Sequence, residues 1–226
     1  MEVIVIRIMV LVFSVIVHEY AHGWTAWKLG DSTARDSGRL TFNPLPHIDP
    51  VGSILVPLML SFTGSIMLGW AKPVPVVPDR LFNPANDHPK VAAAGPLSNL
   101  LLALIFSFLL GLAFFFWGVP SAGTPAPGYS VLLFEMFQVG ILINVVLAIF
   151  NLLPLPPLDG SWILVRFLPT EARLRYLQLH RFGLLTVVGF LLLVRYTFVG
   201  DWVSSGVMGA VYPFFKLSLW LANPSG

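Results

Sequence analysis

The sequence VIVIRIMVLVFSVIVHEYAH, residues 3–22, joins a long apolar run to a cluster of ionisable side chains. Residues 3–17 are apolar except for Arg7 and Ser14, which predicts a helix suited to the interior of a lipid bilayer. A secretory signal is disfavoured, because no basic region precedes the run and HEYAH follows it in place of a cleavage site. Ionisable groups inside an apolar helix are costly without partners, so the cluster predicts a functional site.

The composition of the whole chain agrees with a membrane environment. Of its 226 residues, 56% are hydrophobic and 11% are charged, less than half of the roughly 25% charged residues of soluble domains. The mean hydropathy is +0.81. The net charge of only +2 argues against a nucleic-acid partner, and the absence of cysteine excludes disulfide frameworks and thiol catalysis. We therefore expect an all-α polytopic membrane protein surrounded by the lipid bilayer.

Apolar segments long enough for membrane helices occur at residues 3–27, 51–71, 91–117, 130–153, 183–199 and 202–221. The sequence predicts five to six transmembrane helices. We expect one integral-membrane domain over residues 1–226, with a core at about 1–168 and C-terminal helices at about 169–226.

The segment at residues 51–71 differs from the others, because Pro57, Gly64 and Gly69 interrupt it. Lysines and arginines flank it on both sides, so positive charge does not place its ends on opposite sides of the membrane. A re-entrant segment is therefore favoured, and an ordinary crossing stays the alternative.

Two short segments beside these spans are expected to be extended. The sequence KPVPVVPD at residues 72–79 alternates valine with proline, which is typical of an extended segment at an edge. Among the turn formers of residues 31–50, a short strand is expected around residues 40–42.

The sequence HEYAH at residues 18–22 is an HExxH motif on a helical pattern. Four residues correspond to about 400° of helix rotation, so His18 and His22 project from one face and can share one metal ion. Glu19 lies next to that face. A zinc ion lowers the pKa of a water molecule toward about 7, and a carboxylate can then take its proton.

A catalytic zinc ion needs a third protein ligand. The extended motif of the metzincins is absent, because Thr25 and Lys28 occupy the positions of its glycine and histidine. A thermolysin-type ligand is also absent, because the first glutamate after the motif is Glu135. His47, in a proline-rich loop that we expect to face solvent, is kept as a reserve fourth ligand.

Asp159 is the carboxylate that best fits the third position. It lies in NLLPLPPLDG, residues 151–160, at the end of an apolar span. The three prolines force non-helical backbone, which membranes tolerate only around a cavity or within protein. One zinc ion, two neutral histidines, Glu19 and Asp159 also sum to zero charge, the cheapest arrangement away from water.

These motifs resemble those of the site-2 protease family of intramembrane zinc metalloproteases. The resemblance rests on HEYAH, on GPLSN at residues 95–99 and on NLLPLPPLDG, in the expected order over most of residues 10–165. The sequences GRLTFNPLPHIDPVG and GWAKPVPV resemble the small branch of the family without PDZ or CBS domains.

The resemblance implies a role for each motif residue. His18, His22 and Asp159 would bind one zinc ion per chain, and Glu19 would be the general base. Asn151 would contact the substrate backbone or the developing oxyanion. The substrates implied are single-span membrane proteins or peptides, and the resemblance leaves the oligomeric state open.

The function predicted on these grounds is a zinc-dependent intramembrane endopeptidase that cleaves in or near transmembrane segments. The rival class is a transporter with the three ligands as a transit site, but no internal repeat is visible. An inactive scaffold is disfavoured by the intact Glu19.

The distribution of positive charge predicts the orientation. Residues 119–129 contain no lysine or arginine, whereas residues 166–181 contain four arginines, so the latter are expected on the cytoplasmic side. This places the active site toward the cytoplasm of the cell (inner) membrane. With five crossings, the N-terminus would be outside and the C-terminus cytoplasmic.

Overall fold

The computed structural model describes residues 2–49, 72–120 and 128–223, and within these ranges all regular secondary structure is helical. The long helices are α1 (Glu2–Lys28), α4 (Pro84–Trp117), α5 (Gly128–Leu152) and α9 (Val199–Ala222). The shorter ones are α2 (Thr33–Asp36), η1 (Leu45–His47), η3 (Pro78–Arg80), α6 (Asp159–Val165), α7 (Thr170–Leu177), η4 (Gln178–Phe182) and α8 (Gly183–Tyr196). The expectation of an all-α membrane protein is confirmed.

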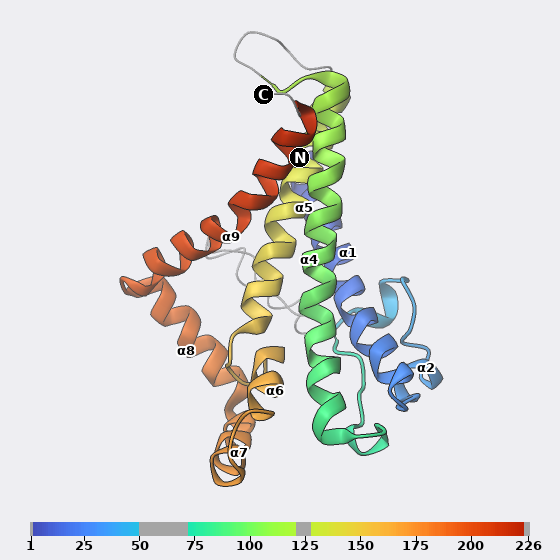
Figure 1. Ribbon diagram of the computed structural model, residues 1–226, viewed down its shortest axis with the longest axis vertical. Coiled ribbons are helices and arrows are strands. Elements are labelled where there is room, and N and C mark those ends of the chain that lie inside the picture. Colours follow the sequence, from blue (N-terminus) through green and yellow to red (C-terminus); the bar gives the residue numbers. More distant parts are fainter. Residues whose placement is uncertain (1, 50–71, 121–127, 224–226) are drawn as a thin grey trace.

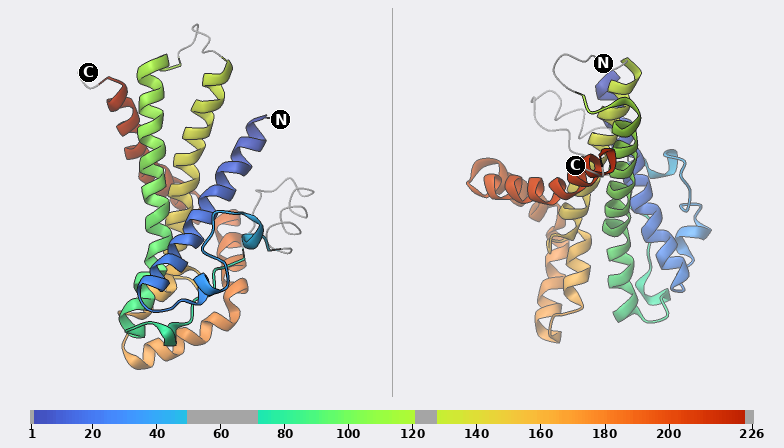
Figure 2. Two further views of the ribbon diagram at one scale, coloured as in Figure 1. Left: turned by 90° about the vertical axis from the view of Figure 1, so that its right-hand side faces the viewer. Right: turned by 45° about the horizontal axis from the view of Figure 1, so that its top comes forward.

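Helices α1, α4 and α5 form the central bundle, and α9 packs against its upper part (Figure 1). Helix α1 runs parallel to α5, as two contacts in the same chain order show. The guanidinium of Arg7 donates to Glu135 at 2.6 Å, and further along both helices Asn144 donates to the Ser14 hydroxyl at 2.9 Å. Helix α4 runs antiparallel to both (Figure 2). Apolar side chains fill the space between α4 and α5, among them Leu110 and Ile141, both fully buried.

Three of the described helices are long and apolar enough to cross a membrane: α1, α4 and residues 130–152 of α5. A fourth is added if the bent pair Thr170–Phe182 and Leu185–Tyr196 is one span. Helix α8 alone has 14 residues, about 21 Å of helix, which is shorter than the roughly 30 Å hydrocarbon core. The number of five to six spans stays a prediction, and the re-entrant segment 51–71 lies outside the described residues.

The course of the C-terminal helices differs from the expectation. Helix α9 runs parallel to α4, since Ser107 donates to the carbonyl of Phe214, and a Cβ on Gly111 would lie 2.7 Å from that of Leu221. Its end therefore lies at the same end of the bundle as the N-terminus, so the expectation that the termini lie on opposite sides is wrong (Figure 1). The reason is that α8 covers only part of the bundle's length and α9 continues in the same overall direction.

The loop after α1 lacks the short strand expected at residues 40–42. These residues form bends, so that expectation is wrong; the hydroxyl of Thr41 instead accepts the backbone N–H of Asn43, two residues on, in a local turn. Residues 72–77 have no regular secondary structure, with Val77 extended, but residues 78–80 form η3, so the extended segment expected at residues 72–79 ends at residue 77. Phe82 then donates its backbone N–H to the carbonyl of Leu29 at 2.8 Å, which ties the start of α4 to the end of α1.

This arrangement predicts the outcome of single-cysteine labelling in a chain that has no cysteine of its own. Ser37→Cys and Ala85→Cys, both exposed at the same end of the bundle, should react with an impermeant thiol reagent from the same side of intact vesicles. Val119→Cys, exposed at the far end of α4, should react from the opposite side. Labelling of Ser37→Cys and Ala85→Cys from opposite sides would contradict the bundle.

Candidate metal centre

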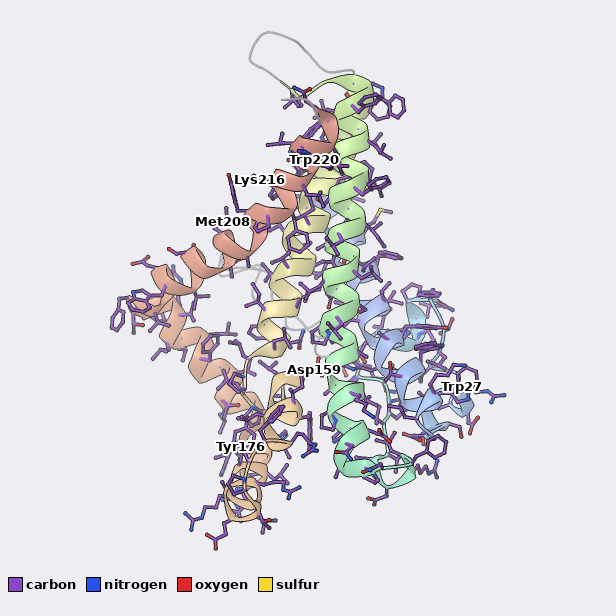
Figure 3. The ribbon with its side chains drawn as sticks, in the orientation of Figure 1. Trp27, Asp159, Tyr176, Met208, Lys216 and Trp220 are labelled. Carbon is purple, nitrogen blue, oxygen red and sulfur yellow. The ribbon has the colours of Figure 1, made fainter. Side chains whose placement is uncertain are left out.

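The structure brings His18, His22 and Asp159 together at the centre of the bundle. His18 and His22 are buried on α1, one helical turn apart, and Asp159 is the first residue of α6, beside α4 (Figure 3). The Nε2 atoms of the two histidines lie 3.0 Å apart. Oδ2 of Asp159 lies 3.2 Å from that of His18 and 3.3 Å from that of His22. Among the described residues these three form the one group that could hold a metal ion.

The hydrogen bonds of the two imidazoles determine which nitrogen carries the proton. Nδ1 of His18 lies 2.6 Å from Oδ1 of Asn99, and Nδ1 of His22 lies 2.8 Å from the carbonyl oxygen of Val91. Both partners are acceptors, so each Nδ1 must be the donor. In the neutral rings each Nε2 is then unprotonated and carries a lone pair. Both lone pairs point to the space that His18, His22 and Asp159 share.

The orientation of Asn99 is fixed in turn by α5. Its amide nitrogen donates to Oδ1 of Asn144 at 2.8 Å, and the Asn144 amide donates to the Ser14 hydroxyl and to the carbonyl of Gly140. Asn99 and Asn144 are both fully buried. Sequence analysis does not predict the bond between Asn99 and His18; the one signal for it in the sequence is a polar side chain within an apolar helix.

Three acceptor atoms that face one another need a cation between them. Oδ2 of Asp159 is buried without a hydrogen-bond partner among the described residues, and it faces the two Nε2 atoms. A single proton would satisfy one of these contacts, whereas an ion would satisfy all three. Zinc bonds of about 2.0–2.1 Å in tetrahedral geometry separate the ligand atoms by roughly 3.3 Å. The donor set and its spacing therefore fit zinc.

Gly95 gives the centre the space it needs. A Cβ atom on this residue would lie 2.4 Å from Nε2 of His22 and 2.6 Å from Nε2 of His18. Any side chain here would enter the space between the ligands. The sequence alone does not predict this role of Gly95, since the register of α4 against α1 is a tertiary property.

The backbone after α5 presents Asp159 from the other side. Leu158 is extended and α6 begins at Asp159. A Cβ on Gly160 would lie 2.2 Å from the carbonyl oxygen of Leu152, so the turn requires glycine. Trp162, one turn further, contacts the ring of His88 on α4 and the ring of His180 on η4, at centroid distances of 4.5 and 4.3 Å. These contacts fix α6 against α4.

Glu19 lies beside this group without belonging to it. Its Oε2 accepts the backbone N–H of Val74 at 2.7 Å. The side chain is half-buried on α1, directly after His18 and three residues before His22 in sequence. A carboxylate placed beside a metal centre, and not among its ligands, is free to exchange protons.

Two other residues singled out in the sequence lie apart from the three ligands. His47 is 2% exposed, so the expectation that it faces solvent is wrong; its Nε2 contacts the carbonyl oxygen of Thr41 at 3.0 Å. It is not a member of the group of possible metal ligands. Asn151 lies near the end of α5, where its amide donates to the carbonyl of Leu147 at 3.0 Å.

Comparison with known proteins gives the family. The model described as "Peptidase family M50" matches residues 126–194. "Putative zinc metalloprotease YwhC" of Bacillus subtilis (strain 168) is 40% identical over 176 residues, which are 78% of this chain and 75% of that protein. "Putative zinc metalloprotease Rip2" of Mycolicibacterium smegmatis is 31% identical over 213 residues, 94% of this chain and 71% of that protein. No solved structure matches.

The match to the Bacillus protein covers most of both chains, and the family model spans Asn151 and Asp159. The chain therefore belongs to peptidase family M50, the site-2 protease family of metalloproteases.

Proposed function

We propose that this protein is a zinc-dependent intramembrane endopeptidase that cleaves peptide bonds in or near the transmembrane segments of other membrane proteins. The observation that carries the proposal is the convergence of His18, His22 and Asp159 inside a bundle of membrane helices, with Glu19 beside them. The relatives named as zinc metalloproteases support the choice of metal.

His18, His22 and Asp159 would hold the zinc ion. Once bound, zinc polarises a peptide carbonyl and makes water acidic enough to lose a proton near neutral pH. The chain's own contribution is to hold the ligands in place: Asn99 and the Val91 carbonyl orient the two rings. These bonds hold each imidazole in the tautomer with its proton on Nδ1, which raises the basicity of the Nε2 atoms that would bind zinc.

Glu19 would act as the general base. Its carboxylate takes a proton from the water molecule that attacks the substrate carbonyl, and then gives this proton to the nitrogen of the leaving amine. The peptide C–N bond breaks as the amine leaves, so the proton that Glu19 accepts is returned and the side chain regains its charge. One carboxylate therefore serves first as base and then as acid.

Asn151 would position the substrate. One hydrogen of its amide nitrogen bonds to Leu147 within α5, and we assign the other polar atoms of the side chain to the substrate backbone. This role suits a residue at the end of α5, between the bundle and the turn that leads to Asp159.

The apolar surface of α1 supports substrates that are themselves embedded in the membrane. The outer face of α1 is apolar and exposed, including Ile4, Met9 and Phe13, so lipid and the helices dissolved in it reach the bundle directly. The amides of a substrate helix are hydrogen-bonded internally, so the helix must unwind before cleavage. We propose single-span membrane proteins or peptides as substrates.

The orientation proposed is an active site toward the cytoplasm of the cell membrane. His18 and His22 lie in the second half of α1, and the arginine-bearing segment that includes α7 follows α6 directly. Positive charge beside the centre supports the cytoplasmic side.

Glu19→Gln should leave zinc content near that of the wild type and lower cleavage by roughly 10²- to 10⁴-fold, because it removes the base and no ligand. Purified protein would be incubated with single-span substrates in liposomes, and products would be followed on gels. Cleavage by this variant at the wild-type rate would contradict the role given to Glu19.

Asp159→Ala should lose zinc and activity together, because three protein ligands become two. Metal content after purification decides this, with Asp79→Ala, an exposed carboxylate, as the matched control. Full zinc content in Asp159→Ala and depletion in His47→Ala would instead make His47 the third ligand.

Gly95→Ala should lower zinc affinity by at least about tenfold, since the new Cβ displaces both imidazoles. Gly189→Ala, where a Cβ meets nothing within 4 Å, should bind zinc like the wild type. Competition with a chelator measures both variants. Equal affinity in Gly95→Ala and wild type would show that α4 does not approach the ligands as closely as described.

A further inference from the structure

The extended residues 72–77, here called the proline-rich segment, make a direct contact with the candidate base. The backbone N–H of Val74 donates to Oε2 of Glu19 at 2.7 Å. Val74 lies between Pro73 and Pro75, which have no N–H. The contact is therefore made by the backbone of one residue, and the sequence around it offers no neighbouring donor.

Two buried charged side chains anchor the ends of this segment. Oδ2 of Asp31 accepts the backbone N–H of Val77 at 2.6 Å. The guanidinium of Arg39 donates to the carbonyl of Lys72 at 2.6 Å and to that of Pro73 at 3.3 Å. Asp31 is fully buried and Arg39 is 8% exposed. Burying such groups is costly unless they bond to something, and the metal centre uses neither.

Asp31 is suited to a permanent anchor. Burial by itself would raise the pKa of its carboxyl group, but hydrogen bonds from the Thr33 hydroxyl and the Val77 and Thr33 N–H groups, with the charge of Arg80, hold the pKa below its ordinary value. The group therefore stays ionised at neutral pH and keeps accepting from Val77.

The proline-rich segment also packs tightly against α1. Val74 is 7% exposed. A Cβ on Gly23 would lie 2.9 Å from Cγ1 of Val74 and 2.8 Å from Cδ2 of Leu40. Gly23 lies four residues after Glu19 and thus on the same face of the helix. Glycine at this position lets the segment approach α1 one turn beyond the carboxylate that it contacts.

We infer that the Val74 backbone N–H positions Glu19 for proton transfer, and that Asp31 and Arg39 act as positioning residues by fixing the proline-rich segment. The inference rests on the proposed function. With Oε2 held by Val74, the carboxylate is kept in one rotamer and Oε1 is the oxygen that accepts and returns the proton. Oε2 can accept the Val74 N–H in both protonation states, so the contact persists through the reaction.

A pair of substitutions at Val74 separates this hydrogen bond from packing. Val74→Pro removes the N–H from an extended residue that already precedes proline, a setting that proline tolerates. Val74→Ala keeps the N–H and removes buried side-chain atoms. Val74→Pro should lower kcat roughly tenfold to a hundredfold with KM and zinc content near wild type, and its kcat should be at least about tenfold below that of Val74→Ala. Equal kcat values for the two variants would overturn the inference.

Arg39 supplies an independent test of the anchor. Arg39→Ala should lower kcat without lowering zinc content, and Arg39→Lys should restore a measurable part of kcat, because an ammonium group can donate to the same carbonyls. Loss of zinc in step with kcat, or no difference between alanine and lysine, would mean that Arg39 only stabilises the fold.

Hydrogen exchange of the Val74 amide tests the contact without any substrate. In the zinc-loaded wild type this amide should exchange slowly, and Glu19→Ala should accelerate its exchange at least about tenfold. The flanking prolines carry no amide hydrogen, so a peptide over residues 72–77 reports few sites. Unchanged exchange overturns the inference whether or not the protein cleaves peptides. A wild type that shows this protection but no cleavage contradicts the proposed function alone.

Discussion

The constraint on which the site depends is the burial of three mutually facing acceptor atoms between the helices. The lone pairs of His18, His22 and Asp159 converge within 3.0 to 3.3 Å of one another, and an unsatisfied buried polar group costs about 1–3 kcal/mol. The surrounding structure holds them there in spite of this cost. The proton of each ring points outward to a fixed acceptor, so the centre presents only acceptors. Such an arrangement is stable when a cation occupies it and strained when none does.

Helix α4 is the template for this arrangement. The face of α1 that meets it carries Ser14, His18 and His22, each four residues from the one before. The facing side of α4 carries Val91, Gly95 and Asn99 at the same interval. Because the helices are antiparallel, the carbonyl of Val91 lies opposite His22 and the amide oxygen of Asn99 lies opposite His18. Gly95, between them, leaves the space for both rings. A shift of one residue in the register would exchange the glycine for a side chain.

The parts of the site that sequence could predict are those that depend on local periodicity. Helix rotation places His18 and His22 on one face, and the prolines before Asp159 mark a non-helical approach to the membrane interior. The roles of Gly95 and Asn99 could not be predicted, because they depend on which residues of α1 face α4. The buried position of His47 depends in the same way on contacts distant in sequence, since its carbonyl oxygen accepts the backbone N–H of Lys72. The course of α9 is set by its close packing on Gly111, far away in the sequence.

The order of the ligands along the chain has a consequence for biogenesis. His18 and His22 lie on α1, which is synthesised before α4 and α5, whereas Asp159 follows both of these helices. Two histidines bind zinc far more weakly than a complete set of ligands. A nascent chain would therefore leave the ribosome as an apoprotein until α5 has been inserted and α6 has docked beneath it. Metal uptake would then be a late step that marks completed assembly, and unfinished chains would carry no metal with which to damage their neighbours.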